Sequence, residues 1–192
     1  MKTYVTTQNT HPAPLAAGHP SLGRKSREGE DGMGIPKKFP SLLENQLGYE
    51  WYGAPATPFR VPAATPWFSS PCLVVCYHSS AVGRLEVEGQ APLPLRARDV
   101  FILPPGTRYR VAILEGRPGR SPALYLRFTL FKTLDLCTFF TPPTLVPATR
   151  AAALRALIDR AAFAPTDEHP LAEAARRKAI AFAYLQELLR LS

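Results

Sequence analysis

Histidine and carboxylate side chains could carry metal or acid–base chemistry in this chain of 192 residues. The sequence contains four histidines, His11, His19, His78 and His169. Neutral imidazoles and a carboxylate that converge on one point can hold iron, manganese or zinc. Only His78 lies in the region where we expect apolar strands, and one histidine cannot assemble such a site. We therefore expect no metal and no cofactor.

The cysteines and the two neighbouring glutamates indicate no catalytic site either. Cys72 and Cys76 lie four positions apart in a predicted strand, roughly 13 Å at ~3.3 Å per residue, which is too far for a disulfide. With Cys137 they do not match a zinc pattern. Glu86 and Glu88 share one face of an alternating strand, usually the solvated face. Because nucleophile-elbow, phosphate-loop and dinucleotide motifs are also absent, we expect a protein that is not an enzyme.

Short strands followed by two helices are the elements that would position these side chains. Apolar or alternating segments predict strands over residues 72–77, 84–88, 100–103, 109–114 and 123–131. Glycine and proline turns join them, which is typical of a sandwich or barrel. In the last fifty residues, Pro147 could open a first helix that stops at Pro165, and Pro170 suits the first turn of a second helix.

The composition narrows the class of protein. The net charge of +8 is spread along the chain instead of forming one basic patch, so charge alone does not indicate a DNA-binding protein. No apolar run approaches the ~20 residues that cross a bilayer, and the first residues lack a secretory signal pattern. We expect a cytoplasmic protein without a membrane contact. Residues 1–38, rich in proline, glycine and polar residues, predict a disordered tail.

The segment from Leu95 to Tyr109 resembles the second signature of cupin barrels. There a Gly-Asp turn leads into an apolar strand, then Pro-Pro-Gly-Thr, then a histidine. Tyr109 stands in place of that histidine, and Arg98 in place of the glycine. The run from about Tyr49 to Ser192 resembles the amino-terminal half of AraC-family transcriptional regulators. The resemblance implies a mainly β fold: a cupin-type double-stranded β-helix barrel (jelly roll) over 39–146, then a helical dimerisation segment over 147–192.

The family resemblance also implies a function. A small-molecule effector would enter the barrel and change how two subunits present their DNA-binding domains. The sequence stops at Ser192, so DNA would be reached only through a helix-turn-helix domain that it does not contain. The expected partners are a small organic effector and a second subunit, in a homodimer or a mixed dimer with a full-length relative. The alternative is a small cupin enzyme of the isomerase or lyase type with an atypical or absent metal site.

Strand alternation and the family resemblance predict which residues meet the effector. Alternation directs Leu85, Val87, Tyr109, Val111, Ile113, Leu124, Leu126, Phe128 and Leu130 inward. The predicted effector contacts are Arg60, Trp67, Tyr77, His78 and Tyr109. For Tyr109 a core tyrosine is the alternative, for Arg60 a surface ion pair, for Trp67 packing under a proline-rich loop, and for His78 a structural role.

The last helix carries the predicted dimer contact. Its apolar residues at helical spacing are Leu171, Ala175, Phe182, Leu185 and Leu189. The alternative for these residues is simple docking on the barrel. Because the helix is apolar on more than one side, both contacts are compatible with the sequence.

Overall fold

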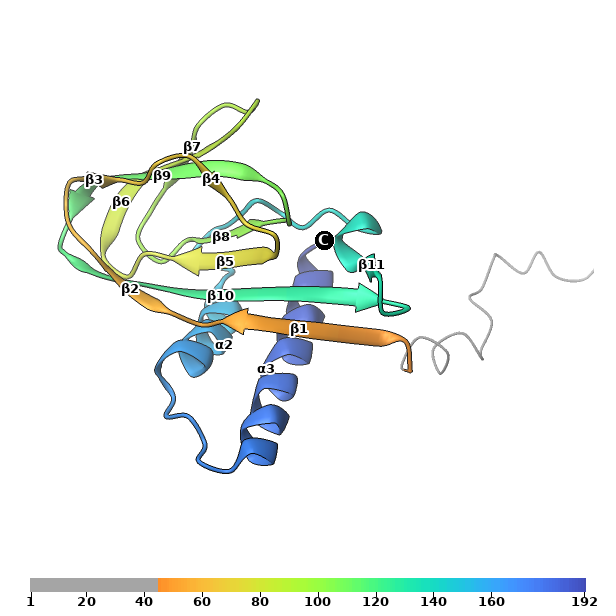
Figure 1. Ribbon diagram of the computed structural model, residues 1–192. Helices are drawn as coiled ribbons and strands as arrows, with labels where there is room; N and C mark the ends of the chain where they lie inside the picture. Colours follow the sequence, from red (N-terminus) through yellow and green to blue (C-terminus); the bar gives the residue numbers. More distant parts are fainter. Residues whose placement is uncertain (1–44) are drawn as a thin grey trace, which may run out of the picture. The chain divides into compact units, whose positions relative to one another are not determined.

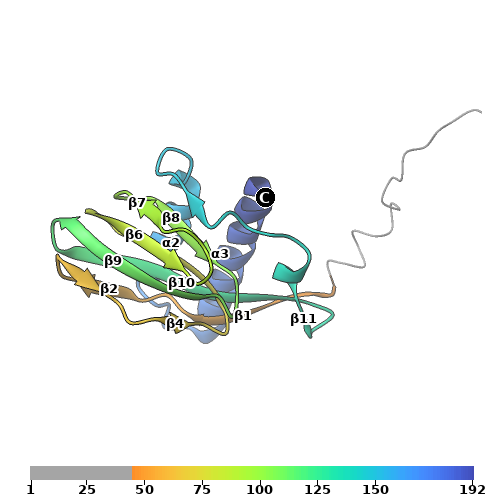
Figure 2. The same cartoon turned by 90° about the horizontal axis from the view of Figure 1, so that it is seen from above.

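The computed structural model describes residues 45–192, and the tail predicted over 1–38 lies outside them. Two antiparallel sheets face each other (Figures 1 and 2). The larger sheet runs β1 (Leu47–Gly53), β10 (Gly119–Leu130), β5 (Leu73–Tyr77), β8 (Val100–Leu103) and β12 (Leu145–Val146), with β2 (Ala56–Phe59) and β11 (Leu134–Asp135) also paired to β10. The smaller runs β3 (Ala63–Ala64), β9 (Arg108–Gly116), β6 (Ala81–Val87) and β7 (Leu93–Leu95), with β4 (Phe68–Ser69) paired to β9.

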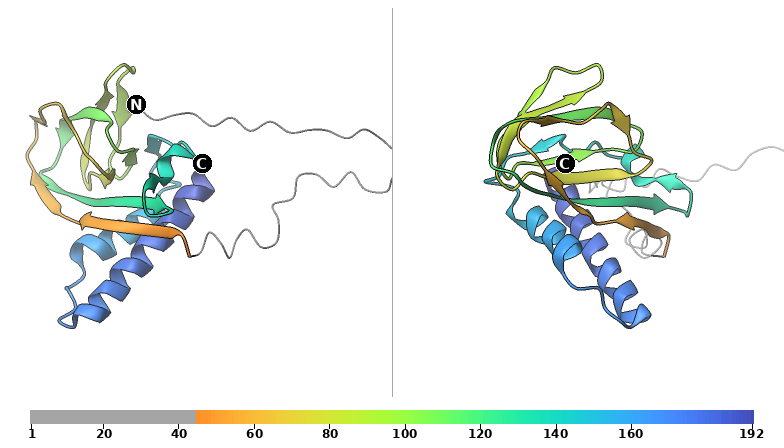
Figure 3. Two further views of the ribbon diagram at one scale, coloured as in Figure 1. Left: turned by 45° about the vertical axis from the view of Figure 1, so that its right-hand side comes forward. Right: turned by 60° about the vertical axis from the view of Figure 1, so that its left-hand side comes forward.

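A short 3₁₀ helix (Leu136–Thr138) and two α-helices complete the described part of the chain. Helices α2 (Ala152–Phe163) and α3 (Pro170–Leu191) lie against the outer face of the larger sheet (Figure 3). None of the helices within residues 45–192 is long and apolar enough to span a membrane.

The predicted mainly β fold with two helices at the carboxyl end is confirmed. The strands expected over 72–77, 84–88, 100–103, 109–114 and 123–131 correspond to β5, β6, β8, β9 and β10. Pro170 occupies the first turn of α3, as predicted. Pro147 does not open a helix: its carbonyl accepts hydrogen bonds from the amides of Arg150 and Ala151, and this turn delays α2 to Ala152.

The larger sheet is buried on both faces, which divides the apolar side chains into two cores. One core lies between this sheet and the helices, and the other lies between the two sheets. On β10 the side chains of Leu124, Leu126 and Phe128 join the helix-side core, contrary to the prediction that they point into the barrel. A strand that is apolar on both faces gives no indication of which face is which, so alternation alone selected the wrong set.

Tyr184 places a hydroxyl in the middle of the helix-side core. The residue is fully buried on α3, and its oxygen has no hydrogen-bond partner among the described residues. A buried polar group without a partner has lost its hydration without replacement and therefore destabilises the fold. On the same side of the sheet, the hydroxyl of Tyr77 donates to the Asp159 carboxylate at 2.5 Å.

Removing the Tyr184 hydroxyl should therefore stabilise the protein. We expect Tyr184→Phe to raise the free energy of unfolding by about 1 kcal/mol. Tyr77→Phe, the matched change of a bonded hydroxyl, should lower it by about 1–2 kcal/mol. Urea denaturation of both variants measures this, and a Tyr184→Phe protein less stable than its parent would contradict the assignment.

Glu173 links the start of α3 to the loop before it. Its carboxylate accepts hydrogen bonds from Arg176 at 2.8 Å, from Arg177 at 2.6 Å and from the amide of Asp167 at 3.3 Å. Arg177 also lies over the ring of Trp51, at 5.7 Å from its centroid. The hydrogen bonds from Arg176, followed by those from Arg177, lower the pKa of Glu173 to about 2.

This lowered pKa predicts an acid-sensitive contact. The charged form of Glu173 is favoured in the folded state, so its contribution to stability is present above the ordinary pKa of a glutamate, about 4.3, and is lost as the pH falls toward 2. We expect the free energy of unfolding of Glu173→Gln to fall less between pH 6 and pH 2.5 than that of the parent. Glu187→Gln, which removes an exposed pair with Arg190, is the control and should change this difference little. Equal pH profiles for the parent and Glu173→Gln would refute the prediction.

Candidate ligand-binding site

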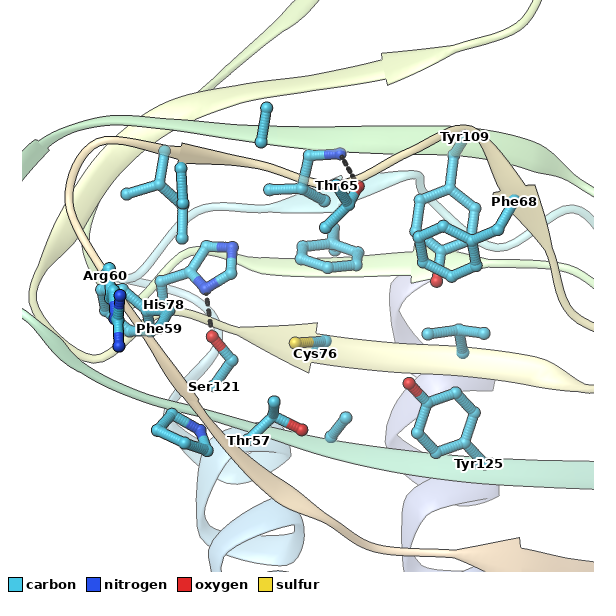
Figure 4. A pocket seen from close by; sticks show the side chains of 18 residues that line it. Thr57, Phe59, Arg60, Thr65, Phe68, Cys76, His78, Tyr109, Ser121 and Tyr125 are labelled. Carbon is cyan, nitrogen blue, oxygen red and sulfur yellow. Dashed lines mark hydrogen bonds between the residues drawn. The ribbon is translucent and has the colours of Figure 1, made fainter.

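A cavity of about 530 Å³ lies between the two sheets (Figure 4). Residues 57–60, residues 63–65 and Phe68 line one side, and His78 with side chains of β5, β8, β9 and β10 lines the rest. Most of its walls are apolar or aromatic, and the cavity is within the size range of small-molecule sites.

Residues 60–69, which we call the strap, close one side of the cavity along β9. Within it, β3 and β4 are strands of only two residues each, and both pair with β9. Thr65 adds a hydrogen bond from its amide to the carbonyl of Val111 and another from the Val111 amide to its hydroxyl. Phe68 lies against Tyr109, with ring centroids 4.1 Å apart. The pairing of β3 and β4 and the Thr65 bond are thus the backbone contacts that hold the strap to β9.

His78 follows β5 and is the buried imidazole of the cavity wall. Its Nδ1 lies 2.6 Å from Ser121 Oγ, and its Nε2 is buried without a hydrogen-bond partner among the described residues. Burial lowers the pKa of His78 to about 4, so the ring is neutral at neutral pH. The ring of Phe59 lies edge-on to it, with centroids 5.4 Å apart. A neutral imidazole with one nitrogen oriented by a hydroxyl leaves the other as a donor or acceptor.

Tyr109 and Tyr125 provide two hydroxyls at the other end of the cavity. They come from β9 and β10, in opposite sheets, and both hydroxyls extend into the cavity (Figure 4). Neither hydroxyl has a hydrogen-bond partner within residues 45–192. Burial raises the pKa of both phenols, which therefore remain protonated and can donate. Phe101 lies between the two ends, its ring centroid 6.0 Å from that of His78 and 6.4 Å from that of Tyr109.

The described wall contains one side chain with a formal charge, Arg60. Arg60 is exposed, on the strap, and forms no ion pair within the described residues. No group of three or more His, Cys, Asp or Glu side chains in residues 45–192 could hold a metal ion. The residues around His78 therefore do not fit the metal centre that a cupin barrel can carry, and we assign no step to a metal.

Three of the five predicted contact residues line the cavity: Arg60, His78 and Tyr109. Tyr77 does not, because neighbours on a strand point to opposite faces and its side chain belongs to the helix-side core. Trp67 is also outside the lining. The residue is 37% exposed, and the guanidinium groups of Arg108 and Arg110 lie over its ring, 5.7 and 5.1 Å from the ring centroid.

Sequence reasoning missed other members of the wall. Phe68, Cys76, Ser121 and Tyr125 line the cavity. Cys76 and Ser121 are neighbours of His78 in the wall. Tyr125 alternates with the leucines of β10 that we expected to face inward, so its side chain lies on the opposite face of the strand. Knowing which face of β10 the helices cover would have identified Tyr125.

The predicted dimer residues divide between the surface and the core. Leu171, Ala175 and Leu189 are exposed, with Leu171 75% and Leu189 51% accessible. Phe182 is half-buried against Tyr49, at 5.8 Å between ring centroids. Leu185 is only 4% exposed within the helix-side core, so its prediction as a dimer contact is wrong. Docking on the barrel, the alternative stated for this helix, accounts for that residue.

No protein-family profile matches the chain, and no curated protein matches its sequence. Two similar solved structures are of bacterial proteins. A proposed mannose-6-phosphate isomerase of Ralstonia eutropha JMP134 is 26% identical over 42% of this chain and 74% of that chain, with a TM-score of 0.29. The DMSP lyase DddQ of Ruegeria pomeroyi DSS-3 is 14% identical over 52% of this chain and 54% of that chain, with a TM-score of 0.34.

Both similar structures are described as enzymes, one as an isomerase and the other as a lyase. They give no support to the AraC resemblance in particular. The prediction that the chain is not an enzyme is contradicted by this finding and is not retained. That prediction depended on the absence of known catalytic motifs. A single histidine that the fold places inside a barrel belongs to none of these motifs.

Proposed function

We propose that this chain is a small cupin enzyme, of the isomerase or lyase type, that binds a small organic molecule in the cavity and moves a proton on it with His78. The buried Nε2 of His78, a nitrogen in the cavity wall with no partner among the described residues, is the observation that carries this proposal. An unpaired buried nitrogen has a free-energy cost that a ligand group can remove.

The wall supplies what a proton-transferring base requires. With its Nδ1–H donating to Ser121 Oγ at 2.6 Å, the imidazole presents the lone pair of Nε2. The low pKa leaves this lone pair free at neutral pH, and the same Ser121 oxygen stabilises the imidazolium that forms when Nε2 takes a proton. The proton then returns from Nε2 to a second atom of the ligand, as in an isomerisation, or to a leaving group, as in a lyase reaction.

Access to His78 requires movement of the wall. Nε2 is covered in the described structure, and its neighbours include Phe59, immediately before the strap. Because two short strands hold the strap, its displacement breaks few backbone hydrogen bonds. The proposal therefore includes an opening of the strap when the ligand enters.

Exchange of ligand hydrogens for deuterium tests this function without knowledge of the product. Small carbonyl compounds, sugars, fatty acids and aromatic compounds are screened by thermal shift, and each binder is incubated with the protein in D₂O and followed by NMR. We expect loss of a carbon-bound proton signal of the bound compound, at a rate reduced about 100-fold or more in His78→Asn. Asparagine can still bond to Ser121 but lacks the base.

The control for this experiment is His169→Asn, which changes an exposed histidine at the start of α3. It should bind and exchange as the parent does. A binder whose protons exchange equally fast with the parent and His78→Asn would refute His78 as the base. A cavity that binds none of the compounds would refute the binding proposal itself.

A second candidate function is effector sensing as the barrel-and-helix part of an AraC-like regulator. The exposed Leu171, Ala175 and Leu189 on α3 favour it, because a second subunit could cover them. Light scattering of the parent and of a Leu171→Glu, Leu189→Glu double variant distinguishes the candidates. Sensing predicts a dimer that the variant converts to a monomer, together with a binder that shows no proton exchange.

A further inference from the structure

The two ends of the cavity differ in the hydrogen bonds that they can offer. At one end two phenol hydroxyls, from Tyr109 and Tyr125, are protonated donors without partners in residues 45–192. At the other end stands the neutral imidazole of His78. Phe101 forms part of the wall between them, about 6 Å from the ring at each end. The cavity therefore suits a ligand with an apolar body and polar groups at both ends.

Charge narrows the class of ligand further. The described wall contains no carboxylate, and its one formal cation, Arg60, is exposed on the strap. A buried ion without a counter-ion loses its hydration and gains too little in return. An ammonium group would find no carboxylate here, and a carboxylate in the interior would find no buried cation. The interior thus favours an uncharged molecule.

The tyrosine hydroxyls decide which polar group fits their end. Two O–H donors from opposite sheets can converge on one acceptor, and a carbonyl oxygen has two lone pairs to receive them. Aromatic side chains nearby, Phe68 and Phe101, provide flat contact surfaces beside these hydroxyls. The same arrangement stabilises negative charge that develops on that oxygen when a neighbouring carbon loses a proton.

We infer that the ligand is an uncharged, flat carbonyl compound whose oxygen accepts hydrogen bonds from Tyr109 and Tyr125 and whose opposite end contacts His78. This inference rests on the proposed binding of a small organic molecule in the cavity. It gives His78 a substrate of the right acidity, since protons on a carbon next to a carbonyl group are the ones that a weak base can remove.

Three matched probes test the ligand class: 4-hydroxyacetophenone, which has the carbonyl group; 4-ethylphenol, which lacks it; and 4-hydroxybenzoate, which is charged. Affinities are measured by NMR titration at pH 7.5. We expect 4-hydroxyacetophenone to bind about tenfold or more tightly than either of the others. Tyr109→Phe and Tyr125→Phe should each weaken its binding about five- to tenfold and leave that of 4-ethylphenol within about twofold. Tyr52→Phe, an exposed tyrosine outside the cavity, should change neither affinity.

The outcomes separate this inference from the proposed function. Tighter binding of 4-hydroxybenzoate, or tyrosine variants that bind 4-hydroxyacetophenone as the parent does, would overturn the carbonyl class and leave the cavity as a binding site. Binding that depends on both tyrosines, without deuterium exchange of the acetyl methyl protons in D₂O, would support the carbonyl class and count against His78 as the base. Failure of all three probes to bind at millimolar concentration would overturn the inference and the proposed binding together.

Discussion

The burial of the larger sheet on both faces is the constraint on which the rest of this structure depends. Strand β5 illustrates it, since all five of its residues are buried, alternating between helix side and cavity side. Without α2 and α3, the apolar side chains on the outer face of β10 and β5 would face water. The helices therefore contribute to the stability of the barrel. Because they bury the outer face, the inner face of the sheet does not have to be packed as densely. A cavity of about 530 Å³ can exist there because the main apolar burial occurs on the other side of the sheet.

Much of the fold could be predicted from the sequence, because the strands and helices carry strong local patterns. Five predicted strands and the start of α3 at Pro170 correspond to observed elements. Which face of each strand or helix points toward which core could not be predicted in the same way. Leu124, Tyr77 and Leu185 were each placed on the wrong side of their element, because a strand or helix that is apolar all round gives no periodic signal. Tyr109 and His78 do line the cavity, as predicted. Tyr109 follows the alternation of β9, and His78 comes directly after the end of β5.

This chain departs from the cupin signature at Arg98, in the turn before β8. Arg98 stands where the signature has glycine, and it keeps the backbone of that glycine, with a φ of +70°. Its amide donates to the carbonyl of His78, and Asp99 accepts hydrogen bonds from the amides of Arg96 and Ala148. These contacts hold a non-glycine residue in a region that costs about 1–2 kcal/mol. The turn thereby fixes the backbone at His78, the residue on which the proposed chemistry depends.

The alternation of β10 has a mechanical consequence. Tyr125 faces the cavity, and its neighbours Leu124 and Leu126 are buried against the helices. One continuous backbone joins the three, so a displacement at Tyr125 is also a displacement of the surface on which α2 and α3 rest. Strand β5 connects the two sides in the same way, because Cys76 faces the cavity while Tyr77 bonds to Asp159 of α2. The cavity and the helix pair thus lie on opposite faces of one thin layer, and the same strands build both surfaces.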